Sequence, residues 1–372
     1  MRLAIVTHNV VRGDGQGRVN IEIARYALQQ GIGVWLAADR VDADILELGA
    51  SWISVCPRRR RVNLLKVMEF TRRADLALRA LPERMDVIHG NGYVLTQAHQ
   101  VNTAHFVHAA WRQSPMHSAR LRRDLNGLYQ WVYSTLNARW EQRAYAQARV
   151  VVAISERVRR ELIAAGVDAG RIRVIPNGVD IEEFHPGGRE RGPLSLPEEV
   201  PLALFVGDIR SPRKNLDTVL RALRFVPDLH LAVVGETAGS PYPAMAAALG
   251  LDERVHFLGF RKDVDRIMRA ADLFVSPARY EPFSLVVLEA MASGLPVIVA
   301  ATVGAADLVT PEAGIVLPEP DDARRLASAL CALVADAPRR CAMGQAARAI
   351  AEQHSWDHMA ASYLQLYSEV AA

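Results

Sequence analysis

Short apolar segments alternate with amphipathic segments along almost the whole of the 372-residue chain. The apolar segments, such as Leu3–Thr7 and Val87–His89, have the length of strands. The amphipathic segments, such as Arg18–Gln30, Val62–Ala80 and Arg120–Gln147, have the length of helices. Parallel strands joined by helices form sheets that are covered on both faces. The alternation therefore predicts an α/β fold built on doubly wound parallel sheets.

This alternation is interrupted once, between residues 182 and 201, where prolines and glycines are concentrated. Such a stretch is typical of a linker. The chain is also about twice as long as a usual domain, which favours two domains. We therefore predict an N-terminal domain over 1–185, a linker over 186–200, a C-terminal domain over 201–353, and a last helix over 354–372 that packs back on the N-terminal domain.

The composition excludes several classes of protein. A net charge of only +3 argues against a dedicated nucleic-acid binder. The three cysteines, Cys56, Cys331 and Cys341, have neither metal-ligand spacing nor a disulfide framework. The chain enters the apolar segment Leu3–Thr7 directly, without the pattern of a signal peptide, and it has no run of about 20 apolar residues. We therefore expect a cytoplasmic protein.

The segment from Tyr280 to Val299 carries the most informative pattern. It follows the predicted strand Leu273–Ser276, and it enters a helix near Ser284. A helix that begins just past the carboxyl end of a strand is where open α/β sheets bind ligands, and its free N–H groups suit a phosphate. Glu281 and Glu289 could accept hydrogen bonds from sugar and ribose hydroxyls. The alternative is a structural salt bridge for the first and a solvated position for the second.

A second candidate segment, Gly207–Asn215, follows the first strand of the predicted C-terminal domain. It contains Arg210, Arg213 and Lys214. Such cations can stabilise negative charge on a phosphate group without a metal. The alternative is a solvated basic turn.

Two features of the N-terminal half also suggest a ligand site. Gly15 and Gly17 lie in a glycine-rich loop that permits close backbone approach, although the spacing of the glycines is not that of a dinucleotide fingerprint. Arg18 follows at the start of the predicted helix, where its side chain could bind a phosphate or face solvent. His105 and His108 lie near the end of a predicted strand. In an extended segment they would point to opposite faces, so we expect only one, His108, to enter a cleft.

The stretch from Glu281 to Glu289, inside Glu-Pro-Phe-Ser-Leu-Val-Val-Leu-Glu-Ala-Met-Ala-Ser-Gly-Leu-Pro-Val-Ile, resembles the glutamate-x7-glutamate motif of retaining glycosyltransferase family 4. The segments 172–180 and 271–277 and the closing Ser355-Trp356 are similar to that family as well. The resemblance implies the GT-B fold, in which two Rossmann-like domains face each other across a cleft. It also implies metal-independent transfer of a hexose, with a UDP-sugar as the favoured donor, to the hydroxyl of a glycan, lipid or small molecule. Bacterial cell-envelope polysaccharide, lipopolysaccharide and glycolipid synthesis are processes that use such transfers.

The same resemblance assigns roles to individual residues. Glu281, Lys214, Arg210 and His108 are expected to act on the reacting groups, with Arg210 preferred to Arg213 as the partner of Lys214. The donor is expected to contact Glu289, the backbone N–H groups of Phe283, Ser284 and Leu285, and the loop glycines Gly15 and Gly17. The chain departs from the usual motif at Pro282 and Ser284, where the family commonly has glycines. A proline fixes φ and cannot donate a hydrogen bond, so this departure affects the path of the loop.

No metal and no cofactor other than the donor substrate is expected. Asp86 has no partnered Asp-x-Asp triplet, and we interpret Asp42-Ala43-Asp44 as a surface loop. A nucleotide-sugar epimerase of the same fold, or an inactive nucleotide- or glycan-binding protein, would share the same motif. A dinucleotide oxidoreductase is the weakest alternative, because the glycine fingerprint is not met.

Basic and aromatic residues are concentrated in the N-terminal half. Arg58–Arg61 form one run, and Arg120, Arg122 and Arg123 lie close to Trp131. Basic amphipathic helices with aromatic residues suit an anionic membrane surface. An ordinary solvated face fits the same pattern, and the sequence does not separate the two interpretations.

Overall fold

The computed structural model describes residues 1–57 and 62–371 of the chain. These residues form two compact units, one of Met1–Gly178 with the segment from Trp356 onward, and one of Val179–Ser355. The first boundary differs from the predicted one, since the residues after Gly178, including the expected linker over 186–200, belong to the second unit. The arginine run Arg58–Arg61 lies outside the described residues.

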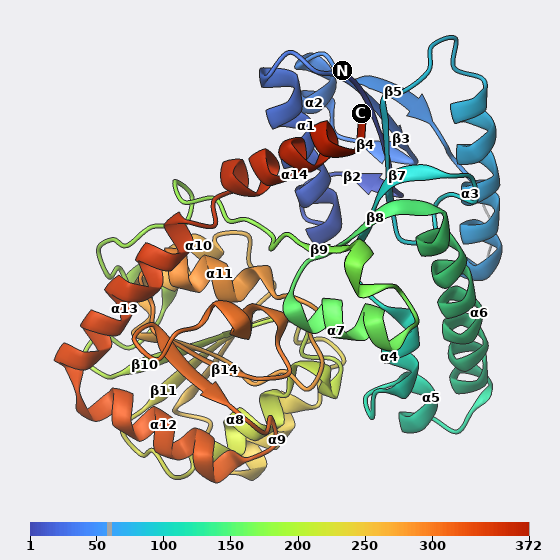
Figure 1. The fold of residues 1–372 in the computed structure, drawn as a ribbon. Coiled ribbons are helices and arrows are strands. Elements are labelled where there is room, and N and C mark those ends of the chain that lie inside the picture. Colours follow the sequence, from blue (N-terminus) through green and yellow to red (C-terminus); the bar gives the residue numbers. More distant parts are fainter. Residues whose placement is uncertain (58–61, 372) are drawn as a thin grey trace. The chain divides into compact units, whose positions relative to one another are not determined.

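The N-terminal unit is built on a seven-stranded parallel sheet (Figure 1). Its strand order is β5-β3-β1-β6-β7-β8-β9. The strands β3 and β5 are added on one side of β1, and the strands from β6 to β9 are added on its other side. Ligands bind at such a switch point, which here lies between β1 and β6. The strands are β1 Arg2–Val6, β3 Gly33–Ala38, β5 Ser51–Ser54, β6 Val87–Asn91, β7 His99–Ala104, β8 Ala148–Ala153 and β9 Ile172–Val174. A short additional pair joins β2 Asn9–Val10 and β4 Arg40–Val41.

The helices of this unit are α1 Gly15–Gln29, α2 Ala43–Glu47, α3 Asn63–Arg79, α4 His108–Gln113, α5 Ser118–Leu121, α6 Leu125–Gln147, α7 Glu156–Ala164 and α14 Trp356–Ala371. The sequence predicts one helix over 120–147, and this prediction is wrong. The chain breaks between α5 and α6, where Asp124 caps α6 by accepting the N–H of Gly127. A Cβ atom at Gly127 would lie 2.1 Å from the carbonyl oxygen of Arg122, so only glycine allows this turn.

The last helix, α14, packs within the N-terminal unit beside α1 (Figure 1). Its Tyr367 hydroxyl lies 2.7 Å from Nδ1 of His89, and its Tyr363 hydroxyl lies 3.1 Å from Oγ1 of Thr103. Burial lowers the pKa of His89 to about 3, so this histidine is neutral at physiological pH. His89 is thus a packed core residue.

The C-terminal unit has a six-stranded parallel sheet in the order β12-β11-β10-β13-β14-β15. Its switch point lies between β10 and β13. The strands are β10 Leu202–Val206, β11 His230–Val234, β12 Val255–Gly259, β13 Leu273–Ser276, β14 Val297–Ala300 and β15 Gly314–Leu317. The helices are α8 Leu216–Leu223, α9 Tyr242–Ala248, α10 Val264–Ala270, α11 Leu285–Ala292, α12 Ala323–Ala335 and α13 Ala337–Glu352. One face of the sheet packs on α8 and α12 through Val219, Leu220, Leu326 and Leu330.

The segment that precedes this sheet is anchored to it by a buried arginine. The Arg191 guanidinium lies 2.7 Å from the Asp272 carboxylate, and both side chains are 3% exposed. Arg191 also donates to the carbonyl oxygens of Ala270, Pro197 and Val200. These bonds explain why the stretch expected to be a free linker belongs to the C-terminal unit.

Several kinds of feature are absent from the part of the chain that the structure describes. No helix there is both long and apolar enough to cross a lipid bilayer. Within the same residues, no group of three or more histidine, cysteine or acidic side chains is arranged to hold a metal ion. The side chains of Cys56, Cys331 and Cys341 are exposed.

Replacing Arg191 by alanine is expected to lower the free energy of unfolding by about 3 kcal/mol, because Asp272 stays buried without its main partner. Urea denaturation followed by circular dichroism measures this loss. Arg189 pairs with the same carboxylate at 2.7 Å, but its side chain is 60% exposed. Arg189→Ala is therefore the matched control, with an expected loss below about 1 kcal/mol. Equal losses in the two variants would contradict the anchoring role of Arg191.

Candidate active site

Two loops meet at the switch point of the C-terminal sheet. One loop leaves the carboxyl end of β10 and leads through Gly207 to Lys214, and the other leaves β13 and leads through Pro277 to Ser284. β10 and β13 are paired neighbours. The carboxyl ends of parallel strands lie at the same edge of a sheet, so the two candidate segments of the sequence analysis come together here.

The first loop ends in a 3-10 turn, Pro212–Lys214, which presents two cationic side chains. Asn215 follows in the left-handed conformation, with φ of 65°, and its side-chain amide donates to the carbonyl oxygens of Pro277 and Pro320. A Cβ atom at Gly207 would lie 3.3 Å from the Lys214 side chain. Asn215 therefore ties this turn to the second loop, and Gly207 leaves room for the lysine.

The carboxylate of Glu281 binds both cations. Its Oε2 atom lies 2.5 Å from Nζ of Lys214 and 3.0 Å from Nη1 of Arg213. The Glu281 and Lys214 side chains are both 13% exposed, so water screens this pair only in part. Burial raises the pKa of Glu281, but Lys214 and Arg213 outweigh burial, and the net pKa lies below its usual value. Glu281 is therefore ionised at neutral pH.

Arg279 holds the two loops in register. Its backbone N–H donates to the carbonyl oxygen of Arg213, and its guanidinium donates to that of Pro212. The same guanidinium forms ion pairs of 2.7 Å with Asp217 and Asp321. Lys214, Arg213 and Glu281 thus depend on a common support.

The turn into α11 adopts a backbone that favours glycine. Ser284 has φ of 85° and ψ of 88°, and its side chain makes no capping hydrogen bond. Two backbone bonds fix the turn, from Gly304 N–H to the carbonyl oxygen of Glu281 and from Ala305 N–H to that of Phe283. Ser284 is one of the two positions where the chain departs from the commonest family loop. The structure shows that the loop keeps a glycine-like conformation in spite of the serine.

The remaining predicted donor residues lie along this turn and helix. Leu285 is the first residue of α11, and the half-buried Glu289 follows one turn later. The first N–H groups of a helix are free to bind an anion. Phe283, Ser284, Leu285 and Glu289 are therefore brought to the same edge of the sheet as Lys214. The structure holds no ligand, so their contacts with a donor stay a prediction.

Arg210 does not join this cluster. Its guanidinium bonds to the Asp208 carboxylate at 3.2 Å, and its side chain is 58% exposed. The structure places Arg213, rather than the preferred Arg210, beside Lys214 and Glu281. The proline at 212 starts the 3-10 turn that carries both Arg213 and Lys214, and this turn was not predicted from the sequence.

A separate cavity of about 160 Å³ lies at the switch point of the N-terminal sheet. His105 and His108 both line it, so the expectation that only one of them would enter a cleft is wrong. The reason is local structure: β7 ends at Ala104 and α4 begins at His108, so the two histidines do not share an extended segment. Gln16, Asn91 and Glu141 line the same cavity.

The glycine-rich loop proves to be the start of α1. Asp14 caps this helix by accepting the N–H groups of Gln16 and Gly17. A Cβ atom at Gly17 would lie 2.5 Å from the carbonyl oxygen of Val11, which gives this glycine a packing role. Gly15 lies in the first turn, and Arg18 pairs with Glu22 at 2.7 Å. Contact of Gly15 and Gly17 with a donor stays a prediction.

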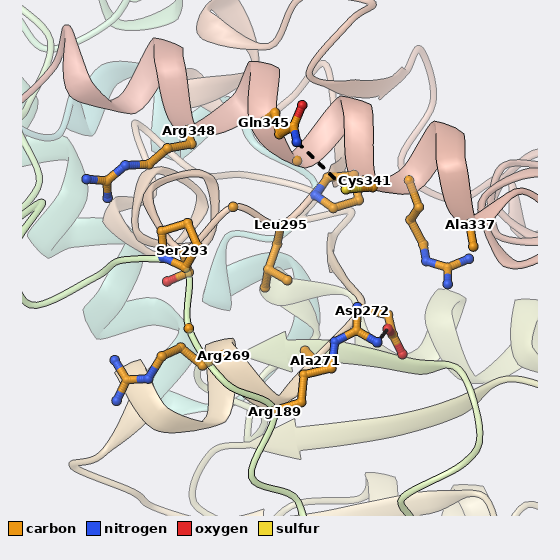
Figure 2. A pocket seen from close by; sticks show the side chains of 16 residues that line it. Arg189, Arg269, Ala271, Asp272, Ser293, Leu295, Ala337, Cys341, Gln345 and Arg348 are labelled. Atoms are coloured by element: carbon orange, nitrogen blue, oxygen red, sulfur yellow. Dashed lines mark hydrogen bonds and ion pairs between the residues drawn. The ribbon is translucent and has the colours of Figure 1, made fainter.

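The C-terminal unit also contains a cavity of about 580 Å³ at the opposite end of its sheet, next to residues that precede β13 and β14 (Figure 2). Four arginines line it, but each is engaged. Arg189 points to Asp272 in Figure 2, and Arg269 pairs with Asp265. Arg340 and Arg348 donate to backbone carbonyl oxygens, among them those of Val334 and Ala292. This cavity lies away from the carboxyl ends of the strands, so it is not the candidate active site.

The fold and the C-terminal site together define a class: two α/β units of Rossmann type, with a cationic cluster beside a helix N-terminus that suits a nucleoside diphosphate. Comparison with known proteins identifies the family. The family model of the glycosyl transferases group 1 matches residues 188–350, and that of Glycosyltransferase Family 4 matches residues 13–183. The chain belongs to the family 4 type of glycosyltransferases, as its motifs suggest.

A curated relative is the D-inositol 3-phosphate glycosyltransferase of Xylanimonas cellulosilytica, which is 34% identical over 248 residues, or 62% of this chain and 59% of that protein. The chain thus spans about three fifths of the length of this relative. Among solved structures, sucrose-phosphate synthase of Thermosynechococcus elongatus matches with a TM-score of 0.79 and 22% identity, over 99% of this chain and 98% of that one. Anabaena HepE in complex with UDP-glucose matches with a TM-score of 0.73 and 22% identity, over 99% and 100%. The GT-B fold class is therefore confirmed.

Replacing Ser284 by glycine is expected to raise the free energy of unfolding by about 1 kcal/mol, because glycine adopts a positive φ without strain. Ser293, at the other end of α11, has an ordinary φ of −76°. Ser293→Gly is therefore the matched control, and it is expected to lower stability by about 1 kcal/mol. Urea denaturation compares the two. A loss of stability in both variants would rule out strain at Ser284.

Proposed function

We propose that this protein transfers a sugar from a nucleoside-diphosphate sugar to an acceptor hydroxyl, with retention of anomeric configuration. The observation that carries the proposal is the pairing of Glu281 with Lys214 and Arg213 beside the N-terminus of α11. Membership of the family supports the reaction class, and retention is part of the proposal. The C-terminal unit would hold the donor, and the N-terminal unit would hold the acceptor.

The charges of the cluster suit a reaction that releases a diphosphate. The two cations share one carboxylate. A bound donor brings its own negative charge, and Lys214 with Arg213 can stabilise the charge that grows on the departing diphosphate. Glu281 can then accept hydrogen bonds from hydroxyls of the sugar. Protein cations and helix N–H groups thus supply the stabilisation, so we propose that no metal takes part.

The donor that we favour is a UDP-sugar. Anabaena HepE, which shares the fold, has been solved with UDP and with UDP-glucose. Glu289, one turn into α11, is the residue that we propose for the ribose hydroxyls. A panel of UDP-, GDP- and ADP-sugars tests this choice. Acceptor-dependent release of the diphosphate indicates a transferase, and isomerisation without an acceptor indicates an epimerase.

Replacing Lys214 by methionine is expected to weaken UDP binding on the order of 10- to 100-fold, because hydrogen bonds from a charged donor to phosphate are lost. Turnover is expected to fall by on the order of 10²-fold or more, and Glu281→Ala is expected to cost a similar factor. Titration calorimetry in EDTA measures the binding, and diphosphate release measures the turnover.

Matched controls exist for both cations. Lys262 is exposed and lies in another loop, so Lys262→Met is expected to leave UDP binding unchanged. Arg213→Ala is expected to weaken binding more than Arg210→Ala, because only Arg213 contacts the cluster. Near-normal binding and turnover in Lys214→Met and Glu281→Ala would remove the site assignment.

We also propose that the N-terminal unit contacts an anionic membrane surface. Four large apolar side chains are exposed around the start of α6: Leu121 at 50%, Leu125 at 86%, Leu128 at 59% and Trp131 at 49%. The basic residues Arg120, Arg122 and Arg123 are exposed beside them. Apolar side chains that enter a bilayer interface next to cations that meet anionic headgroups bind such surfaces.

Replacing both Leu125 and Trp131 by glutamate is expected to reduce binding to vesicles of phosphatidylglycerol and phosphatidylcholine by on the order of tenfold or more, because the apolar area that enters the interface is lost. Co-sedimentation measures the bound fraction. Phe225 of the C-terminal unit is 50% exposed, and Phe225→Glu serves as the control. Equal binding to vesicles without the anionic lipid would contradict the electrostatic part of the proposal.

A further inference from the structure

The cavity of the N-terminal unit contains a histidine whose orientation is set by a buried carboxylate. Glu141, on α6, has a side chain only 7% exposed. Its two oxygens accept from a single residue: Oε2 accepts the backbone N–H of His108 at 2.9 Å, and Oε1 lies 2.6 Å from Nδ1 of the same residue. A carboxylate oxygen accepts, so Nδ1 is the donor of this bond and carries the proton. In the neutral ring, Nε2 is then the acceptor that remains for a ligand.

The second histidine of the cavity has the opposite tautomer. Nε2 of His105 lies 2.9 Å from Oδ1 of Asn91. The side-chain nitrogen of Asn91 donates to the carbonyl oxygen of Val6, so its Oδ1 atom accepts, and His105 donates through Nε2. Burial lowers the pKa of His105 to about 4, against an opposing effect of Asp14. His105 is thus neutral at physiological pH, with Nδ1 as its free acceptor.

The size and lining of the cavity restrict its ligand. Its volume is about 160 Å³, and apolar cavities of about 150 Å³ accept one benzene-sized ring. Tyr93, Phe106 and Tyr133 supply aromatic walls. The described residues that line it include no lysine or arginine, the side chains whose fixed charge pairs with phosphate. A single ring with hydroxyl donors and no phosphate fits these properties.

We propose that Glu141 is a positioning residue, which fixes His108 so that Nε2 accepts a hydroxyl of an uncharged six-membered polyol ring. This inference rests on the proposed function, because the ring would be the acceptor or its terminal unit. It differs from what the name of the D-inositol 3-phosphate glycosyltransferases says of their acceptor, since the ring in this cavity carries no phosphate.

Imidazole ¹⁵N chemical shifts of the full chain test the role of Glu141. In the wild-type protein, the shifts of His108 are expected to show the proton on Nδ1. Glu141→Gln offers one acceptor and one donor in place of two acceptors. It therefore cannot accept hydrogen bonds from both the backbone N–H and the Nδ1–H of His108. The proton is therefore expected to move, at least in part, to Nε2. A wild-type His108 with its proton on Nε2, or an unchanged tautomer in Glu141→Gln, would overturn the proposal.

The matched control is Ser134→Ala on the same helix. Ser134 is buried and bonds to Nε2 of His117 at 2.9 Å, outside the cavity. This variant removes a buried hydrogen bond from α6, so it should lower stability but leave the His108 tautomer unchanged. A moved tautomer in Ser134→Ala would mean that any disturbance of α6 has this effect, and the specific role of Glu141 would be rejected.

Ligand class is tested on the same samples with two probes, myo-inositol and inositol 3-phosphate. Titration with myo-inositol is expected to shift the His105 and His108 signals. The dissociation constant from this titration is expected to be about tenfold higher in Glu141→Gln, because one hydrogen bond to a buried group is lost. The phosphorylated probe is expected to bind more weakly than myo-inositol. Tighter binding of the phosphorylated probe, or no shift with either probe, would overturn the uncharged-ring assignment.

Failure of this inference can be told apart from failure of the proposed function. The histidine signals report only on the N-terminal cavity, whereas calorimetry with UDP reports on the cluster around Lys214. A protein that binds UDP but shows the wrong tautomer would keep its proposed function and lose this inference. A protein that shows the expected tautomer and binds myo-inositol, but binds no nucleotide, would keep the ring site and lose the proposed function, together with the role of the ring as acceptor.

Discussion

The ion pair between Glu281 and the cations Lys214 and Arg213 is the interaction on which the C-terminal site depends. It joins the loops that leave β10 and β13, and so it sets the geometry of the switch point. Two cations on one carboxylate leave a local excess of positive charge beside the free N–H groups of α11. An anion with several oxygens is the natural partner of such a site, because it can satisfy the cations and the N–H groups together.

The fold was predictable to a large extent because buried parallel strands leave a strong pattern in a sequence. Segments such as Val297–Ala300 are apolar throughout, since both faces of the sheet are covered. The break between α5 and α6 was not predictable in the same way. It depends on the close approach of Gly127 to the carbonyl oxygen of Arg122, and helical periodicity does not report such a contact.

The site was predictable in its loops but less so in its side-chain partners. Resemblance singled out Glu281 and Lys214, and the structure brings them within 2.5 Å of each other. Arg213 could be preferred to Arg210 only once the 3-10 turn at Pro212 was known. That His105 and His108 line one cavity could be seen only once β7 was known to end at Ala104. Glu141 could not have been found from spacing, because it comes from a helix more than thirty residues further along the chain.

We propose that protein cations and a helix N-terminus, with no metal, hold the diphosphate of the donor. A crystal structure with UDP, grown in the presence of EDTA, tests it most directly. We expect diphosphate oxygens within hydrogen-bond distance of Nζ of Lys214 and of the backbone N–H groups of Ser284 and Leu285. UDP bound elsewhere, for example in the cavity of Figure 2, or bound only when manganese is supplied, would contradict it.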